Sequence, residues 1–224
     1  MTSLFYIEHS NGKVSDQSLK AITAAIEIDG ETHGLIAGSN IDEAVTEASK
    51  ISGLNKLIHI DSSEFDNVLA EKLTDVLNGM SDQYDYFLAA ATTTGKNVMP
   101  RLSALLDVSQ ISEIIAIEGP DIFIRTIYAG NAIATVQTSD AKKVLTVRPT
   151  AFKASEIGTE SCEISKISPE NISSISEYVG EELTKSDRPE LTSAKTIISG
   201  GRGMQNGDNF ELLDKVAAKL GAAV

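Results

Sequence analysis

The sequence predicts an α/β protein with a doubly wound, mostly parallel sheet, an antiparallel β extension, and the first β-α unit of a second α/β domain. Two observations predict this fold. From residue 3 to residue 118, continuous apolar segments alternate with segments whose apolar residues recur at helical spacing. Such strands are buried on both faces by helices, and right-handed crossovers between them produce a doubly wound sheet. After Gly119 the pattern changes to short β-rich segments separated by turn signals.

The alternating region begins with two strand–helix units. "LFYIEH" (4–9) predicts a strand, and "SLKAITAAIEI" (18–28) has the apolar spacing of a helix. "GLIAG" (34–38) predicts a second buried strand. "NIDEAVTEASKI" (40–51) predicts the next helix, because acidic residues in its first turn interact favourably with the helix dipole.

The same alternation continues through the next segments. "KLIHID" (56–61) predicts a third strand, and "EFDNVLAEKLTDVLNG" (64–79) predicts a helix that its last glycine ends. "YDYFLAAAT" (84–92) predicts a fourth strand, "NVMPRLSALLD" (97–107) a helix, and "ISEIIAIEG" (111–119) a further strand. The parallel sheet therefore has its strands and its covering helices in regular order.

Three β-rich segments follow Gly119. They are "DIFIRTIYAG" (121–130), "NAIATVQT" (131–138) and "KKVLTVRPTAF" (142–152), with turn signals between them. We expect antiparallel hairpins added to the end of the sheet. The first domain, an α/β scaffold of the nucleotide-binding type, is accordingly predicted to span residues 1–152.

The remaining chain predicts a connector and one further β-α unit. Residues 153–194 are rich in Ser and Glu and poor in apolar residues, which indicates a connector. "AKTIIS" (194–199) predicts a buried strand, "GGRGMQNGDN" (200–209) a turn, and "FELLDKVAAKLGAAV" (210–224) a helix. Because one strand without neighbours does not make a stable domain, we expect residues 195–224 to be the start of a truncated second domain.

Composition excludes several classes of protein. A net charge of −13 argues against binding to nucleic acid, which requires a concentrated positive surface. The single cysteine, Cys162, excludes an internal disulfide framework and a cysteine metal cluster, and His9, His33 and His59 are too scattered to predict a metal site. No apolar run is long enough to cross a bilayer, so we do not expect a membrane protein. The first residues carry no targeting signal, so a bacterial cytoplasmic location is expected; a processed chain of the mitochondrial matrix would look similar.

Four segments, which are spread along nearly the whole chain, closely resemble the electron-transfer flavoprotein alpha subunit. They are "YIEHSNG" (6–12), "ATTTGKNVMPRLSALLDVSQISEIIAI" (91–117), "IRTIYAGNAIATV" (124–136) and "LTKSDRPELTSAKTIISGGRGM" (183–204). The segments occur in the family's order. Each would be weak evidence alone, and together they are specific.

The resemblance implies a flavoprotein of electron transport in which the alpha subunit forms a heterodimer with a beta subunit. One FAD is held mainly by the alpha subunit's second domain. The heterodimer carries electrons from acyl-CoA dehydrogenases of fatty acid beta-oxidation, and from related dehydrogenases, to a membrane-associated quinone oxidoreductase. Such a protein is a carrier and not a substrate-converting enzyme. A family member continues for about another hundred residues. The resemblance therefore implies that residues 195–224 begin a FAD-binding domain and that this chain alone binds flavin weakly or not at all.

The glycine-flanked arginine of "SGGRG" is the candidate cofactor-binding site. The resemblance places Arg202 where the family has an arginine that contacts FAD. Such an arginine can donate charge-assisted hydrogen bonds, each contributing about 1.5–3 kcal/mol, to a reduced flavin or to its phosphates. Gly201 and Gly203 are included as backbone that lets a ligand approach closely. From spacing alone, a strand-to-helix turn with a solvated arginine is the more ordinary explanation, because glycine-rich turns are common.

A second candidate site is "TTTGKN" (92–97), in which Gly95 and Lys96 follow a predicted strand. It suggests a phosphate-binding turn, but the Walker spacing is absent, and in the family it is the beta subunit that holds AMP. We favour a tight turn with Lys96 exposed or facing the partner subunit. The alternative function is a stand-alone adenine-nucleotide-binding α/β module that uses this turn and the strand ends.

Two further pairs of residues are candidates for structural roles. Glu8 and His9 lie at the carboxyl end of the first predicted strand, where open α/β sheets bind ligands, but no nucleophile or metal-ligand spacing accompanies them. We expect a structural hydrogen bond there. Arg125 and Tyr128 lie in a predicted hairpin, where packing or an interface is the expected role.

Overall fold

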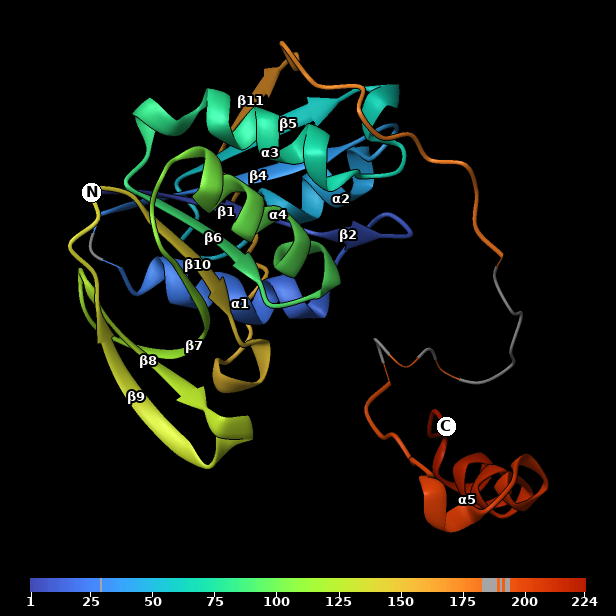
Figure 1. Ribbon diagram of the computed structural model, residues 1–224. Coiled ribbons are helices and arrows are strands. Elements are labelled where there is room, and N and C mark those ends of the chain that lie inside the picture. The colour runs from blue at the N-terminus through green and yellow to red at the C-terminus, as the bar shows by residue number, and fades with distance from the viewer. Residues whose placement is uncertain (29, 183–188, 190, 192–193) are drawn as a thin grey trace. The chain divides into compact units, whose positions relative to one another are not determined.

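The computed structural model describes residues 1–28, 30–182, 189, 191 and 194–224. These residues form two units, Met1–Tyr178 and Val179–Val224. Within the described residues, the first unit is organised by one nine-stranded sheet and a small two-stranded sheet of β2 (His9–Ser10) and β3 (Lys13–Val14) (Figure 1).

The strands of the large sheet lie in the order β11 (Glu163–Ile167), β5 (Lys56–Asp61), β4 (Glu31–Gly38), β1 (Thr2–Tyr6), β6 (Tyr86–Ala90), β10 (Lys143–Val147), β7 (Gln110–Gly119), β8 (Ile122–Ile127), β9 (Ala132–Gln137). Every neighbouring pair from β11 to β7 is parallel. β8 pairs antiparallel with β7, and β9 pairs antiparallel with β8. The predicted fold class is confirmed: a mostly parallel sheet with an antiparallel extension at one edge.

Four helices cover the two faces of this sheet: α1 (Asp16–Ile26), α2 (Asp42–Ala48), α3 (Ala70–Gly79) and α4 (Thr93–Leu105). Figure 1 shows α1 on one face and α3 with α4 on the other. Successive residues of a strand point to opposite faces. Phe5 and Leu88 accordingly pack with α1 and α2, while Leu4 and Phe87 pack with α3 and α4. Burial on both faces explains why the central strands are continuously apolar.

One strand differs from the sequence-based expectation. The segment 142–152 was predicted to be part of an antiparallel addition at the end of the sheet, and that prediction was wrong. Its strand, β10, lies parallel between β6 and β7. Val144 and Val147 are completely buried, as are both residues between them, and this is the burial of a central strand. The hairpin of β8 and β9 alone forms the edge.

A strand in the predicted connector was missed. β11 pairs with β5 at the opposite edge of the sheet, and each of its residues has a partner there, from Glu163 with Lys56 to Ile167 with Ile60. Its side chains are exposed or half-buried, which is why the sequence of this strand carries so few apolar residues. An edge strand is held chiefly by backbone hydrogen bonds, and these leave no signal in the hydropathy pattern.

The second unit contains one α-helix among its described residues, α5 (Glu211–Leu220), preceded by two short 3-10 turns, η5 (Arg202–Met204) and η6 (Gly207–Phe210). The predicted strand over 194–199 is reduced to one parallel bridge, between Ile197 and Ala223. A strand needs a neighbour along its length, and the part of this unit that is described supplies only the residues after α5.

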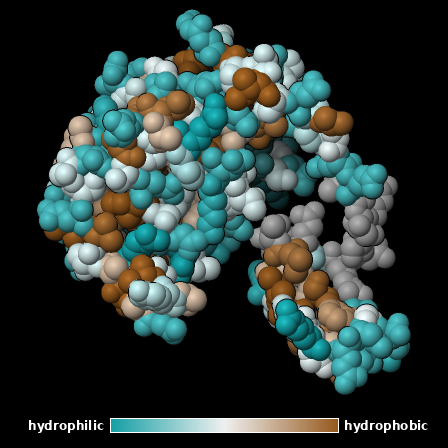
Figure 2. Space-filling model, viewed as in Figure 1, coloured by the Kyte–Doolittle hydropathy of each residue, from teal (hydrophilic) through white to brown (hydrophobic). Residues whose placement is uncertain are grey.

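Apolar side chains gather on the surface of this second unit (Figure 2). Leu212 is 63% exposed and Leu220 60% exposed, and Val216 between them is also exposed, so one stripe of α5 faces outward. Among all the described residues, no helix combines the length and the apolar content needed to span a membrane.

Candidate functional site

The predicted cofactor segment lies between a parallel bridge and a helix. Ile198 donates its backbone N–H to the carbonyl oxygen of Ala223 at 2.9 Å, and Ala223 donates to the carbonyl of Thr196 at 3.0 Å. The chain then turns through η5 and η6 before α5 begins. This is the strand–turn–helix order that the sequence predicts, although only one bridge of the strand is formed.

Arg202 opens the η5 turn, and its side chain is exposed. Among the described residues, its guanidinium group makes neither a hydrogen bond nor an ion pair. Its donors are therefore available to a ligand. An exposed cation beside a backbone turn fits the phosphate or the reduced ring of a flavin chemically, since both carry negative charge.

The glycines of this turn divide into two kinds. A Cβ atom at Gly201 or at Gly203 would meet no atom within 4 Å, and neither glycine has a positive φ. The space beside both glycines is therefore open, and a ligand could approach the backbone closely there. The turn itself does not require glycine at either position. Gly200 is different, because a Cβ there would lie 2.7 Å from Leu213 Cδ1 and 2.9 Å from Phe210 Cζ. The constrained glycine is the one that the sequence analysis did not single out.

A second candidate site lies at the point where the strand order reverses. The chain adds β4 and β5 on one side of β1 and then places β6 on the other. Open α/β sheets bind ligands at the carboxyl ends of strands around such a point. A cavity of about 520 Å³ opens at this edge, and Glu8, His9 and Thr94 are among its lining residues.

The carboxylate of Glu8 is held at the N-terminus of α4. Thr92 Oγ1 donates to Glu8 Oε1 at 2.5 Å and accepts from the backbone N–H of Gly95 at 3.1 Å, so Thr92 caps the helix while it binds the carboxylate. Burial raises the pKa of Glu8, and the hydrogen bonds from Thr92 and Thr94 act in the opposite direction. His9 Nε2 lies 2.9 Å from the carbonyl oxygen of Ala37. Both side chains thus make structural hydrogen bonds.

This arrangement argues against a nucleotide at "TTTGKN". The segment is not a tight turn before a helix: α4 begins at Thr93, four residues before the predicted start, so Lys96 belongs to its first turns. The capping threonine at Thr92 explains the earlier start. The carboxylate of Glu8 sits where a phosphate would approach the helix N-terminus, and the two negative charges would repel each other.

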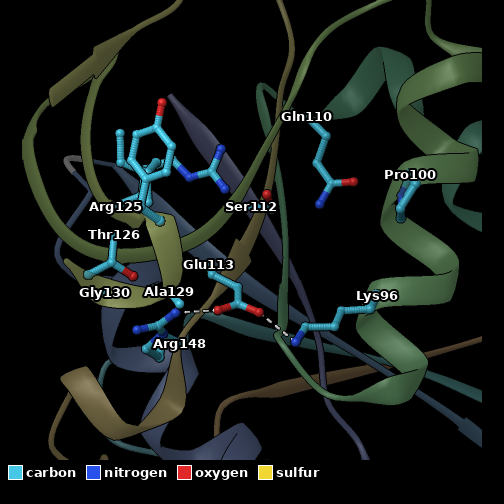
Figure 3. Close-up of a pocket in the computed structure, with 12 residues that line it drawn as sticks. Lys96, Pro100, Gln110, Ser112, Glu113, Arg125, Thr126, Ala129, Gly130 and Arg148 are labelled. Carbon is cyan, nitrogen blue, oxygen red and sulfur yellow. Dashed lines mark hydrogen bonds and ion pairs between the residues drawn. The ribbon is translucent and has the colours of Figure 1, made fainter. Parts of the chain in front are cut away.

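The structure brings Lys96, Arg125 and Tyr128 together in one cavity of about 720 Å³ (Figure 3). The sequence analysis named all three but did not relate them. Two further charged residues line the same cavity: Glu113 on β7 and Arg148, which follows β10. Glu113 accepts from Lys96 Nζ through Oε1 and from Arg148 Nη2 through Oε2, each at 2.5 Å. The two donors, Lys96 first, hold the pKa of Glu113 below its ordinary value.

Comparison with known protein families gives two matches. Residues 3–171 match the electron transfer flavoprotein domain. Residues 190–224 match the electron transfer flavoprotein FAD-binding domain. The second match includes the described residues around Arg202, and it ends with the last residue of the chain.

Several curated proteins align with the whole of this chain. The electron transfer flavoprotein subunit alpha of Pseudomonas aeruginosa is 47% identical over 224 residues, which are 72% of its own length. The subunit of the same name from Bradyrhizobium diazoefficiens is 45% identical over 225 residues, 71% of its length. A probable mitochondrial alpha subunit from Cryptococcus neoformans is 40% identical over 232 residues, 67% of its length.

Proposed function

The chain belongs to the electron transfer flavoprotein alpha-subunit family, and from this membership we propose that it works as the alpha subunit of a heterodimer with FAD. Members of the family carry electrons and do not convert a substrate. The heterodimer takes electrons from acyl-CoA and related dehydrogenases and passes them to a quinone oxidoreductase. The observation that carries this proposal is the similarity, along the whole of this chain, to proteins of that name, of whose own length it spans 72% and 71%.

We assign separate roles to a scaffold domain and to a cofactor-binding segment of this chain. Residues 1–152 form the α/β domain that packs on the beta subunit, residues 153–194 are the connector, and residues 195–224 begin the FAD-binding domain. The match of 190–224 to the FAD-binding family supports the last of these assignments. The connector itself contributes β11, which pairs with β5 at the edge of the scaffold's sheet.

Arg202, with Gly201 and Gly203, is the proposed FAD-binding element. FAD, when bound, accepts electrons and releases them again. The part of this chain is to bind and orient the cofactor: the guanidinium of Arg202 donates to negative groups of FAD, and the two glycines leave room for it. The absence of a hydrogen bond or ion pair to Arg202 from any described residue supports this role.

Fluorescence titration with FAD tests the site. We expect weak or absent binding by the chain alone. In a complex with a beta subunit that holds FAD, Arg202→Met should weaken binding about tenfold or more, since a charge-assisted hydrogen bond contributes about 1.5–3 kcal/mol. Lys215→Met is the matched control, because Lys215 is a cation of the same unit that pairs with Glu211 at 2.9 Å. Equal affinities of the wild type and Arg202→Met would overturn the assignment of Arg202.

Co-expression with a beta subunit of the family tests the function. Size-exclusion chromatography should give a one-to-one complex, and the absorbance spectrum should report whether flavin is retained. In a complex that holds FAD, an acyl-CoA dehydrogenase with its substrate should bleach the flavin band. If the flavin of the complex is not reduced, acyl-CoA dehydrogenases are not its electron donors.

We place the protein in a bacterial cytoplasm, a location that localisation of the tagged chain would check.

A further inference from the structure

The cavity of about 720 Å³ on the first unit lies between α4, β7, β8 and the η3 turn (Tyr128–Gly130). It belongs to a different unit from Arg202 and lies outside the crevice around Glu8. Figure 3 shows side chains from these elements converging on it, with Lys96 reaching across from α4 and Arg125 from β8.

The charge of the cavity is opposite to that of the protein. Its lining contains three cations, Lys96, Arg125 and Arg148, and one carboxylate, Glu113. The net charge of the lining is thus +2, in a chain whose net charge is −13. Cations grouped in a concave site on an acidic protein form a local attraction for anions.

The internal ion pairs account for only two of these cations. Glu113 binds Lys96 and Arg148. Within the described part of the chain, Arg125 has no carboxylate partner, and its Nε is buried without a hydrogen bond. The neighbouring Thr126 Oγ1 is also buried without a partner. Buried donors without partners are costly, and a bound acceptor would remove that cost.

The backbone around the cavity is held in unfavourable conformations. Glu113, Tyr128 and Ala129 have φ values of 55°, 51° and 55°. Elsewhere among the described residues, only Gln205 adopts a positive φ without being Gly, Asn or Asp. Such conformations are unfavourable for a residue with a side chain, and they occur at β-bulges and hairpin turns as well as at functional sites. Here they occur where β7 shifts register against β10, near Glu113, and in the turn between β8 and β9, and they set the positions of the lining side chains.

We propose that this cavity binds the phosphate group of a small ligand. A phosphate monoester carries up to two negative charges near neutral pH, which matches the net charge of the lining. Arg125 presents a planar fork of donors suited to phosphate oxygens, and Lys96 and Arg148 have donors to spare beyond those that Glu113 uses. The volume exceeds that of a phosphate alone and leaves room for an organic part, for which the ring of Tyr128, 80% exposed, offers an apolar surface.

Titration of the complete chain with inorganic phosphate tests this proposal. We would record amide NMR spectra at neutral pH and constant ionic strength, with acetate as the reference anion. Saturable shifts should appear at residues of β7, β8 and η3, at lower concentrations of phosphate than of acetate. Shifts confined to residues around Arg202, or no saturation, would overturn the proposal. Because the readout is in the first unit, it is independent of flavin binding.

Two variants with opposite expected effects separate a binding role from a structural one. Arg125→Met should weaken phosphate binding about tenfold or more, while Glu113→Gln should strengthen it severalfold, because it removes the competing carboxylate and frees Lys96 and Arg148. Lys20→Met removes the same charge as Arg125→Met from the exposed surface of α1 and should leave the affinity unchanged. Equal affinities of wild type and Arg125→Met, or weaker binding by folded Glu113→Gln, would overturn the assignment.

Discussion

At the scale of single residues, the side chain of Glu113 connects three parts of the first unit. It lies on β7 at a positive φ, accepts from α4 through Lys96, and accepts from the segment after β10 through Arg148. No local sequence feature marks it. Its partners are 17 and 35 residues away in the chain, and they meet only because β10 inserts between β6 and β7.

The pH dependence of stability should reveal the ion pairs of Glu113 with Lys96 and Arg148. The pKa of folded Glu113 lies below its ordinary value of 4.5, because Lys96 and Arg148 stabilise the carboxylate. A lowered folded pKa contributes stability that is complete above the unfolded pKa and is lost as pH falls through the folded pKa. Glu113→Gln should therefore lower the melting temperature near neutral pH by about 2–4 °C, corresponding to about 1 kcal/mol for partly exposed pairs.

The difference between the two proteins should shrink as the pH is lowered below 4.5, and melting curves recorded by circular dichroism from pH 7 to pH 3 would measure it. Glu160→Gln is the control, since Glu160 is an exposed carboxylate without an ion pair among the described residues. The melting temperature of Glu160→Gln should differ from that of the wild type by the same amount at every pH. If the difference in melting temperature between the wild type and Glu113→Gln grew toward acid pH, the ion pairs of Glu113 would not be the source of this stability.

At the scale of elements, α4 shows how packing on the sheet fixes where a helix begins. Thr92 caps it, Glu8 binds the cap, and Gly95 lies directly against β6. A Cβ at Gly95 would lie 2.0 Å from the carbonyl oxygen of Ala90, which is backbone and cannot move aside. The glycine that looked like part of a phosphate-binding turn is required for helix–strand packing.

Gly95→Ala should therefore destabilise the protein by about 3 kcal/mol, the upper part of the range for overpacked cores, or more. Gly79→Ala is the matched helical control, because a Cβ at Gly79 would meet no atom within 4 Å. The control should be neutral or stabilising by up to about 1 kcal/mol. Urea denaturation of both variants would measure the free energies of unfolding. A Gly95→Ala protein as stable as the wild type would show that α4 can shift away from β6.

At the scale of the whole chain, the two units differ in how much apolar surface they bury. The first unit has a core on each face of its sheet. The described part of the second unit buries only Ala217, Ala222 and Ala223 among its hydrophobic residues, and the apolar stripe of α5 is exposed. Because hydrophobic burial is the main source of folding free energy, the second unit should be much the less stable.

Hydrogen exchange should resolve this difference. Amides of α5 should exchange more than about 100-fold faster than those of β1 and β6, because units with few buried contacts open at low free energy. Mass spectrometry of peptides from the complete chain would report both units in one experiment, and α1, a helix of similar length, is the internal control. Equal protection of α5 and α1 would mean that the second unit is stabilised by contacts other than those within it.

The sequence by itself determined the fold class, the alternation of strands and helices, and the family. Apolar periodicity and motif order are local properties that can be seen along the chain. Only the tertiary structure decided that β10 is central and parallel, that β11 belongs to the sheet, and that Lys96, Glu113, Arg125 and Arg148 share one cavity. These depend on which distant segments pair, and strand pairing is set by the burial and backbone hydrogen bonds of the whole sheet, which no short stretch of sequence contains.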